Sequence, residues 1–416
     1  MSISQKYQTA SGDSVVLSTS SSDIYLSSAI SIPYYKSLFR QQNIKPRFRV
    51  FVLNPDETIR YPLPNERIQE GGSYSENYQD GQRRTMSLTL FNEDGKFTPS
   101  INSLWIDSKF SLELGIEMPN GQIVWNKKGI YVISNSSTTH SSDDKTVPLS
   151  LGDKFNALTG KLGTLETTYE IPIGSDIEEV IKGLLNMDKG NGYVLDPKPI
   201  IYHSSFKGKK TQTKISKSAG STVGEIILEL GTQLSAEVFY NVEGNLVVTP
   251  IQETSSDIDK PVLYDFKATL GDMQSVNFDF NMSEVINRVI VTGTTQNGAV
   301  HHAIAVNDDT SSPLCYQRIG YRTGSPINDS NITSDLLAQE RAKYELRKQL
   351  ILKSSVNLPV TFNPLLLVNN LVTITDEFYG LQEQKFLIQS ISCNLGYEGM
   401  MSISVSNLQN LPFLSV

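Results

Sequence analysis

The sequence is poor in the residues that most often build metal and nucleophile sites, with two cysteines and four histidines among 416 residues. Cys315 and Cys393 lie far apart and in no metal-ligand spacing, which suits a reducing compartment, and we expect two free, partly buried thiols. No apolar run approaches the roughly 20 residues that span a bilayer. The N-terminal residues lack the charged segment followed by an apolar segment that is typical of a signal peptide. We therefore predict no membrane span and a protein that stays in the cell that makes it.

Positive charge is also scarce, because the chain has 36 lysines and arginines but 44 aspartates and glutamates, which gives a net charge of -8. Nucleic-acid affinity comes largely from basic side chains that displace counterions, so we expect no specific nucleic-acid partner. Hydrophobic residues (38%) and charged residues (19%) are both sparse, while Ser, Thr and Asn are frequent. This balance favours strands and turns over helices.

The length predicts two to four domains, since one domain commonly takes roughly 100–200 residues. Residues 1–44 are Ser-rich without a sustained period, and we interpret them as an arm that a partner orders. We predict a first β domain at residues 45–160, an α+β domain at residues 161–260, and a second β domain at residues 261–416. The fold class is thus mainly β.

Alternating apolar residues predict the strands of the first β domain. Met86, Leu88 and Leu90 alternate with Ser87 and Thr89, which places an apolar and a polar row on opposite faces of one strand. An earlier strand ends at the turn signature Asn54-Pro55-Asp56. Asn120-Gly121 stands between two apolar runs and supplies the positive φ angles of a tight hairpin.

Two capping boxes predict the helices of the α+β domain. Ser175 and Glu178 precede one apolar helical face, and Thr222 and Glu225 precede another. The turn Glu243-Gly244-Asn245 then joins two strands. A small unit of two helices and several strands follows from this pattern.

Strands return after Pro261, with a hairpin turn at Asn297-Gly298. One longer helix at residues 334–350 interrupts them. Its packing stripe consists of small and apolar residues at helical spacing: Ala338, Ala342, Leu346 and Leu350.

The end of the first β domain and the end of the chain show a similar order of elements. Apolar alternations at residues 111–116, 130–135 and 147–151 match those at residues 370–375, 386–392 and 401–406, with a polar turn before the last strand of each set. A duplicated barrel would explain this order. The alternative is that any two antiparallel meanders look alike, and the residue identities do not match.

The sequence offers few candidates for chemistry. The Gly-x-Ser-x-Gly run of an α/β hydrolase is missing. His301 and His302 precede Asp308 and Asp309, but adjacent strand residues point to opposite faces, so a surface pair is favoured over a metal or acid–base cluster. The segment at residues 92–95 resembles the start of a calcium loop, yet position twelve is Ser103, so we predict a β turn.

Lysines gather in a polar stretch without interleaved aromatics, which favours a solvated loop or a surface for an acidic partner over base stacking. They are Lys207, Lys209, Lys210, Lys214 and Lys217. Gly208-Lys209 lacks the upstream glycine of a phosphate-binding loop. Carboxylate pairs for glycoside hydrolysis cannot be selected from 44 acidic residues. We predict no catalytic, cofactor-binding or metal-binding residues and no cofactor.

Two segments of the chain resemble the baseplate hub, or tail-tip, proteins of tailed bacteriophages. Residues 88–99 with Leu104-Trp105 look like the strand, Asp-Gly turn and Leu-Trp segment of such proteins. Residues 287–293, the helix with Ala342 and Tyr344, and the closing strands are similar to a hub's final domain. The resemblance covers about residues 45–406, while the Ser-rich arm departs from it.

The resemblance implies two tube-like antiparallel β-barrel domains with an inserted α+β domain. It further implies a homotrimer that presents a pseudo-hexameric ring between the tail tube and the spike, in the virion, after assembly in the bacterial cytoplasm. The implied partners are the tail tube or tube-initiator protein and the tail spike or cell-puncturing protein. Tape measure and baseplate wedge proteins are further candidates.

Three functions follow as expectations. The first is a structural, non-enzymatic hub. The second is a tail-associated cell-wall hydrolase, which would need a carboxylate pair in a cleft. The third is a receptor-binding tail protein, because β domains rich in Tyr often recognise sugars and this chain has 18 Tyr, although they are scattered along the sequence.

Overall fold

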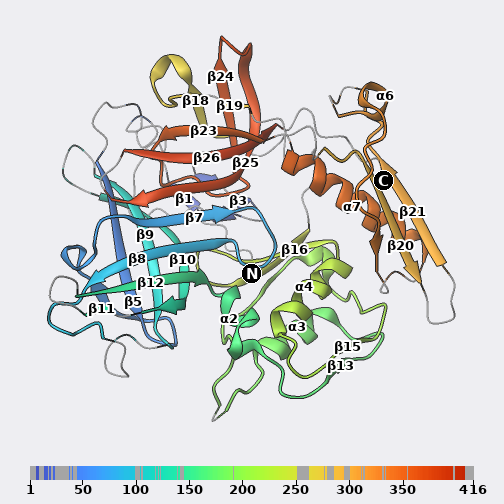
Figure 1. Ribbon diagram of the computed structural model, residues 1–416, viewed down its shortest axis with the longest axis horizontal. Coiled ribbons are helices and arrows are strands. Elements are labelled where there is room, and N and C mark those ends of the chain that lie inside the picture. Colours follow the sequence, from blue (N-terminus) through green and yellow to red (C-terminus); the bar gives the residue numbers. More distant parts are fainter. Residues whose placement is uncertain are drawn as a thin grey trace.

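Figure 1 shows the computed structural model of the 416-residue chain. The structure describes residues 6–8, 14–16, 18–19, 22–23, 37, 40, 45–98, 104, 106–117, 119, 121, 123–137, 139–140, 145–190, 192–250, 262–275, 277–278, 285–294, 300–310, 312, 314–329, 332, 334–353, 355–396 and 399–407. The predicted arm at residues 1–44 lies mostly outside these ranges. Its described parts include four short strands: β1 (Lys6–Gln8), β2 (Ser14–Val16), β3 (Ser18–Thr19) and β4 (Ser22–Asp23).

The alternating residues after Lys45 form the predicted strands. They are β5 (Pro46–Leu53), β6 (Ile59–Leu63), β7 (Gly72–Asn77), β8 (Arg84–Phe91), β9 (Lys109–Glu117), β10 (Ile123–Ser136), β11 (Thr139–His140) and β12 (Lys145–Asp153), with the 3-10 helix η1 (Asn65–Arg67) after β6. Met86, Leu88 and Leu90 are buried on one face of β8, as predicted. The hairpin of β9 and β10 is also present, and Gly121 has a φ of 81°, while Asn120 lies outside the described residues.

The C-terminal part supplies a second set of strands. They are β18 (Val262–Lys267), β19 (Asn277–Phe278), β23 (Ser355–Thr361), β24 (Leu371–Asp376), β25 (Leu381–Leu395) and β26 (Met400–Asn407), with the 3-10 helix η4 (Ala268–Leu270) after β18. They share one continuous 14-stranded sheet with the first set, because β25 pairs with β7. Figure 1 shows the red C-terminal strands beside the blue N-terminal ones.

The prediction of a mainly β protein is confirmed, but the described strands do not close into two barrels. The sheet curls far enough that Ile68, just after β6 and η1, forms a bridge with Leu90 on β8. A single apolar core runs beneath both sets of strands. Buried apolar residues of both sets belong to this one core, for example Leu88 and Leu112 from the first set and Leu358 and Ile388 from the second.

The two sets of strands are also a structural repeat. The neighbours β7-β8-β12-β10-β9-β5 correspond, in both chain order and pairing, to β19-β23-β26-β25-β24-β18. Both long strands carry a bulge at the same place, between Ile133 and Asn135 in β10 and between Ile388 and Ser390 in β25. The similar order of elements in the two parts of the sequence thus reflects two sets of strands with matched registers. One pair departs, since β5 runs antiparallel to β9 while β18 runs parallel to β24.

The middle of the chain forms a unit of helices and strands around its own core, and this unit begins with α2, before residue 161. Its elements are α2 (Phe155–Thr159), η2 (Lys161–Gly163), β13 (Tyr169–Ile171), α3 (Ile177–Leu185), β14 (Ile201–Tyr202), η3 (Ser204–Phe206), β15 (Ile215–Lys217), α4 (Val223–Gln233), β16 (Ala236–Tyr240) and β17 (Leu246–Pro250). The capping box of Thr222 and Glu225 is present. The other predicted box is wrong, because Asp176 caps α3 and the Ser175 hydroxyl donates to the Pro172 carbonyl instead.

The remaining elements make a separate lobe, on the right in Figure 1. They are β20 (Arg288–Thr294), β21 (Val300–Val306), α6 (Tyr316–Ile319), β22 (Ile327–Asn328) and α7 (Asp335–Lys353). α7 is the predicted long helix, and its stripe of Ala338, Ala342, Leu346 and Leu350 is buried. These strands form a three-stranded sheet of their own, packed against α7 in a third core. The β20–β21 hairpin is present, while Asn297-Gly298 lies outside the described residues.

Candidate functional site

A buried charged cluster lies where the 14-stranded sheet meets the middle unit. We call it the Glu57 cluster, and its members are Glu57, Lys109, Lys154, Asp196, Lys198 and Tyr240. Glu57 stands in the β5–β6 turn, and Lys154 follows β12 directly. Asp196 and Tyr240 belong to the middle unit, so the cluster joins the two cores.

The distances within the Glu57 cluster are those of charged hydrogen bonds. The Lys154 Nζ lies 2.6 Å from Glu57 Oε1 and 2.8 Å from Asp196 Oδ1. Lys109 and Lys198 reach Glu57 at 2.9 Å and 2.5 Å. The Tyr240 hydroxyl donates to Asp196 Oδ2 at 2.8 Å. Burial alone would raise the pKa of Glu57, but the charges of Lys154 and Lys109 outweigh it and lower this pKa to about 2.

A second buried cluster joins the same two cores, and we call it the Arg83 cluster: Glu76, Tyr78, Arg83, Arg84 and Glu237. Arg83 donates to Glu237 Oε2 at 3.0 Å, and its guanidinium lies 3.5 Å from the centre of the Phe239 ring. The Tyr78 hydroxyl donates to the other Glu237 oxygen. Arg83 and Glu237 are 1% and 4% exposed, so the pair is shielded from solvent.

Asp153 connects the strands and the first helix through backbone groups. Its Oδ2 accepts from the Arg83 and Arg84 amides at 2.8 and 3.0 Å, and its Oδ1 accepts from the Phe155 amide at 3.0 Å. Complete burial raises the pKa of Asp153 to about 6, although these hydrogen bonds oppose that rise. The carboxylate therefore fixes where β8 starts and where α2 starts.

Lys128 is the buried cation at the contact between the two sets of strands. Its Nζ donates to the Leu366 carbonyl at 2.6 Å and lies over the Tyr74 ring. Burial lowers the pKa of Lys128 to about 8. Sequence reasoning found none of these buried charges. The only signal was a charged residue at the end of an alternating strand, as with Arg83, Lys109 and Lys154.

The structure separates the residues that the sequence offered as candidates for chemistry. The His301 ring lies 2.9 Å from Asp335 Oδ1, and His302 is exposed on the opposite face of β21. Residues 92–95 form the predicted turn, in which the Gly95 amide donates to the Asn92 carbonyl. Within the described ranges, no group of histidines, cysteines and carboxylates could hold a metal ion.

The lysines at residues 207–217 border a solvated loop. Lys207, Lys209 and Lys210 are exposed, while Lys214 pairs with Glu170 and Lys217 with Glu229. Both cysteines are free and buried, as expected. None of the helices that the structure describes is long and apolar enough to cross a bilayer.

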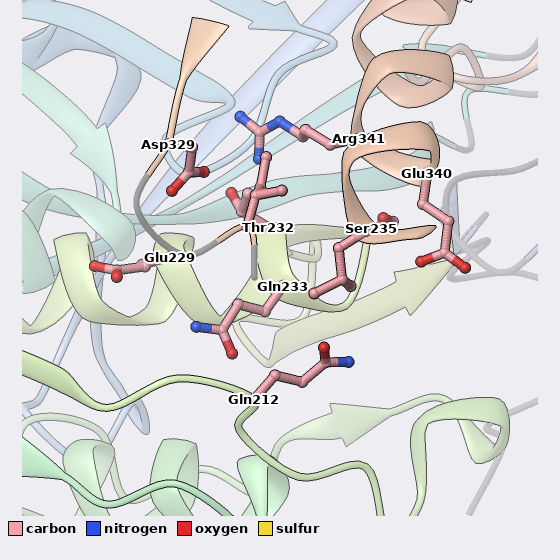
Figure 2. A pocket seen from close by; sticks show the side chains of 10 residues that line it. Gln212, Glu229, Thr232, Gln233, Ser235, Asp329, Glu340 and Arg341 are labelled. Carbon is pink, nitrogen blue, oxygen red and sulfur yellow. The ribbon is translucent and has the colours of Figure 1, made fainter. Parts of the chain in front are cut away.

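One cavity of about 260 Å³ lies between the middle unit and the α7 lobe (Figure 2). Gln212 and α4 residues such as Thr232 line one wall, and Glu340 and Arg341 on α7 line the other. The volume is below the roughly 300 Å³ at which small-molecule sites begin. Glu229, at its edge, is already paired with Lys217 at 2.7 Å. We interpret the cavity as the seam between two units.

Comparison with known proteins gives one family model, a domain of unknown function named DUF5048, which matches residues 311–412. No curated protein matches the chain. Among solved structures, a tail protein from Neisseria meningitidis has a TM-score of 0.57 at 12% identity, covering 88% of this chain and 99% of that one.

Two further structures share the fold. The 43 kDa tail protein of prophage MuSo2 from Shewanella oneidensis has a TM-score of 0.54 at 15% identity, with 88% of this chain and 99% of that chain covered. A chain of the Francisella PdpA–VgrG complex has a TM-score of 0.51 at 11% identity, and the match covers 90% of this chain but 60% of that one. The chain thus has the fold of phage tail proteins.

Proposed function

We propose that this protein is a structural hub of a phage tail, a trimeric ring that connects the tail tube to the spike or tip, and that it works by assembly without catalysis. The observation that carries this proposal is the repeat within one continuous sheet. One chain holds two six-stranded units of matched register, joined by β7 and β25. Three chains would present six such units, which suits a tube of sixfold symmetry.

Closure into a ring would pair the open edges of the sheet. Open sheet edges present unpaired backbone groups, and proteins normally cover them. A head-to-tail contact that repeats around an axis closes into a ring. In this proposal an open edge of one chain meets an open edge of the next, the tube stacks on the six β units, and the middle unit and the α7 lobe lie outside the ring.

The buried clusters support a role in transmitting force along the tail. A tail transmits force along its axis, so the parts of a hub must not move separately. The Glu57 and Arg83 clusters tie the sheet to the middle unit through groups that are nearly or fully buried, and breaking such pairs is costly. The shared fold with phage tail proteins supports a structural role in a tail.

The two alternative functions receive less support. Tyr74, Tyr131 and Tyr240 are at most 1% exposed and serve the cores. The described tyrosines that are exposed lie in three different parts of the chain and do not share one groove: Tyr193 in the middle unit, Tyr321 in the α7 lobe and Tyr379 between β24 and β25. Glu76, Asp196 and Glu237 are paired with internal cations or hydroxyls, which leaves them unsuited to act on a bulky cell-wall substrate. We therefore favour the hub.

The test is the mass of the purified full-length protein in solution, measured by light scattering over a range of concentrations. The proposal predicts three copies of the 46.2 kDa chain. A peptidoglycan zymogram of the same sample should show no clearing. A protein that stays monomeric at high concentration, or a clearing that one Asp or Glu substitution abolishes, would contradict the proposal.

A further inference from the structure

The contact between the two six-stranded units within one chain is an antiparallel strand pair. β25 spans 15 residues, and its first half pairs with β24 on one side. On the same side its second half pairs with β7, from Ser390 opposite Asn77 to Leu395 opposite Gly72. The second unit thus offers the far end of its long strand, and the first unit offers its outermost strand.

Each unit contains both halves of this contact, yet each uses only one of them inside the chain. The counterpart of β25 in the first unit is β10, and the counterpart of β7 in the second unit is β19. The registers make the match residue by residue. Tyr131 opposite Phe110 corresponds to Phe386 opposite Val372, and both pairs precede the shared bulge by two residues.

The unused halves are open in the part of the chain that the structure describes. β10 and β11 pair with β12 on one side, and no described strand pairs with residues 133–137, 139 and 140 on the other. Ser134, Asn135 and Ser136 are exposed. β19 pairs with β23 alone, and it forms one end of the sheet.

We propose that β19 of one copy pairs antiparallel with the β10–β11 end of the next copy, in the register that β7 and β25 use within the chain. Ser73 pairs with Asn394, and the matched registers place Asn277 where Ser73 stands and Thr139 where Asn394 stands. Asn277 of one copy therefore lies opposite Thr139 of the next. This inference rests on the proposed ring.

The backbone of β10 is oriented for this contact. The Ser137 amide donates to the Pro148 carbonyl of β12. Successive residues of a strand turn their amides to opposite sides, so the Ser136 amide points to the open side. We expect a second copy to bind this edge, because the corresponding edge of β25 already binds β7 within the chain. The strand β19 of a second copy is the counterpart of β7.

A cysteine pair tests the register. Oxidation of the purified full-length variant with Thr139→Cys and Asn277→Cys should give a covalent trimer on a non-reducing gel, because directly opposite residues have Cβ atoms about 5 Å apart. A reductant should cleave the disulfides and return the trimer to monomers. Each single variant is the matched control and should give no species above a dimer. A double variant that is trimeric by light scattering but stays uncrosslinked would overturn this register while leaving the ring intact. A wild-type monomer would overturn both.

Proline at Ser136 tests the edge itself. Ser136→Pro removes an amide from the open side and keeps the Ser137 bond to β12, so the fold should persist by circular dichroism. In the proposed register Ser136 stands two residues along the edge from the position opposite Phe278, the last residue of β19, so the proline ring crowds the joint and self-association should weaken about tenfold or more. Ser136→Ala keeps the amide and should associate like the wild type. Equal association of the Pro and Ala variants would refute the proposal, and the cysteine pair decides the matter if the Pro variant does not fold.

Discussion

The Lys154 ammonium lies 2.8 Å from Asp196 Oδ1, across the boundary between the 14-stranded sheet and the middle unit, and their side chains are 4% and 1% exposed. Asp196→Asn would leave Lys154 with less negative charge in a site that water does not reach. We predict a loss of about 3 kcal/mol in the free energy of unfolding, measured by urea denaturation.

The control for Asp196 is an exposed pair of the same type. Glu170 and Lys214 are 53% and 49% exposed at 2.9 Å. Glu170→Gln should change the unfolding free energy by less than about 1 kcal/mol. Equal effects of the two substitutions would show that the Glu57 cluster does not hold the units together.

Arg83 should couple the unfolding of the two cores. Arg83→Met leaves the Glu237 carboxylate buried, and among the described residues the Tyr78 hydroxyl is then its one remaining side-chain partner, which favours separation of the middle unit from the sheet. Scanning calorimetry should show the wild type unfolding in one transition and the variant in two. Arg49→Met, which removes a pair on the sheet surface, should keep the single transition. A single transition in both variants would contradict the coupling.

Lys128 should leave a signature in the pH dependence of stability. Its pKa is about 8 in the folded protein because of burial, while the ordinary value is 10.5. Between these two values the unfolded chain binds more protons, so the contribution of Lys128 to stability rises with pH, by about 3 kcal/mol in all. Lys128→Met should lack this rise. We would measure the difference between the two unfolding profiles from pH 7 to 10.5, and parallel profiles would argue against a buried cation.

The helix caps test the correction at α3. Asp176→Ala and Thr222→Ala should each lower the unfolding free energy by about 1 kcal/mol, because each side chain accepts a hydrogen bond from an amide of the first helical turn. Ser175→Ala should cost less, since its hydroxyl bonds the Pro172 carbonyl outside the helix. A larger loss of unfolding free energy for Ser175→Ala than for Asp176→Ala would show that Ser175 caps α3, as the sequence predicted.

Much of the local structure could be predicted from the sequence, because strand alternation and helix caps are short-range signals. Met86, Leu88 and Leu90 became the buried face of β8, and Thr222 capped α4. Ser175 failed as a cap because both it and Asp176 can fill that role, and only the path of the chain before the helix decides between them.

The site itself could not be predicted, because it depends on spatial neighbours. Lys154 and Asp196 are 42 residues apart, and Arg83 and Glu237 are 154 apart. Charged residues are ordinarily solvated, and the position of Arg83 and Lys154 at the ends of strands was too weak a signal to mark them as buried. The echo between the two β parts was visible, but only the matched bulges in β10 and β25 separate a repeat from two similar meanders.

Averaged electron micrographs of the purified full-length protein would show whether the protein forms a ring. We expect a ring of three copies with a central hole, six similar β units around the hole, and the middle units and α7 lobes at the outer side of the ring. Particles without a central hole, or rings made of a number of copies other than three, would show that the protein does not form this ring.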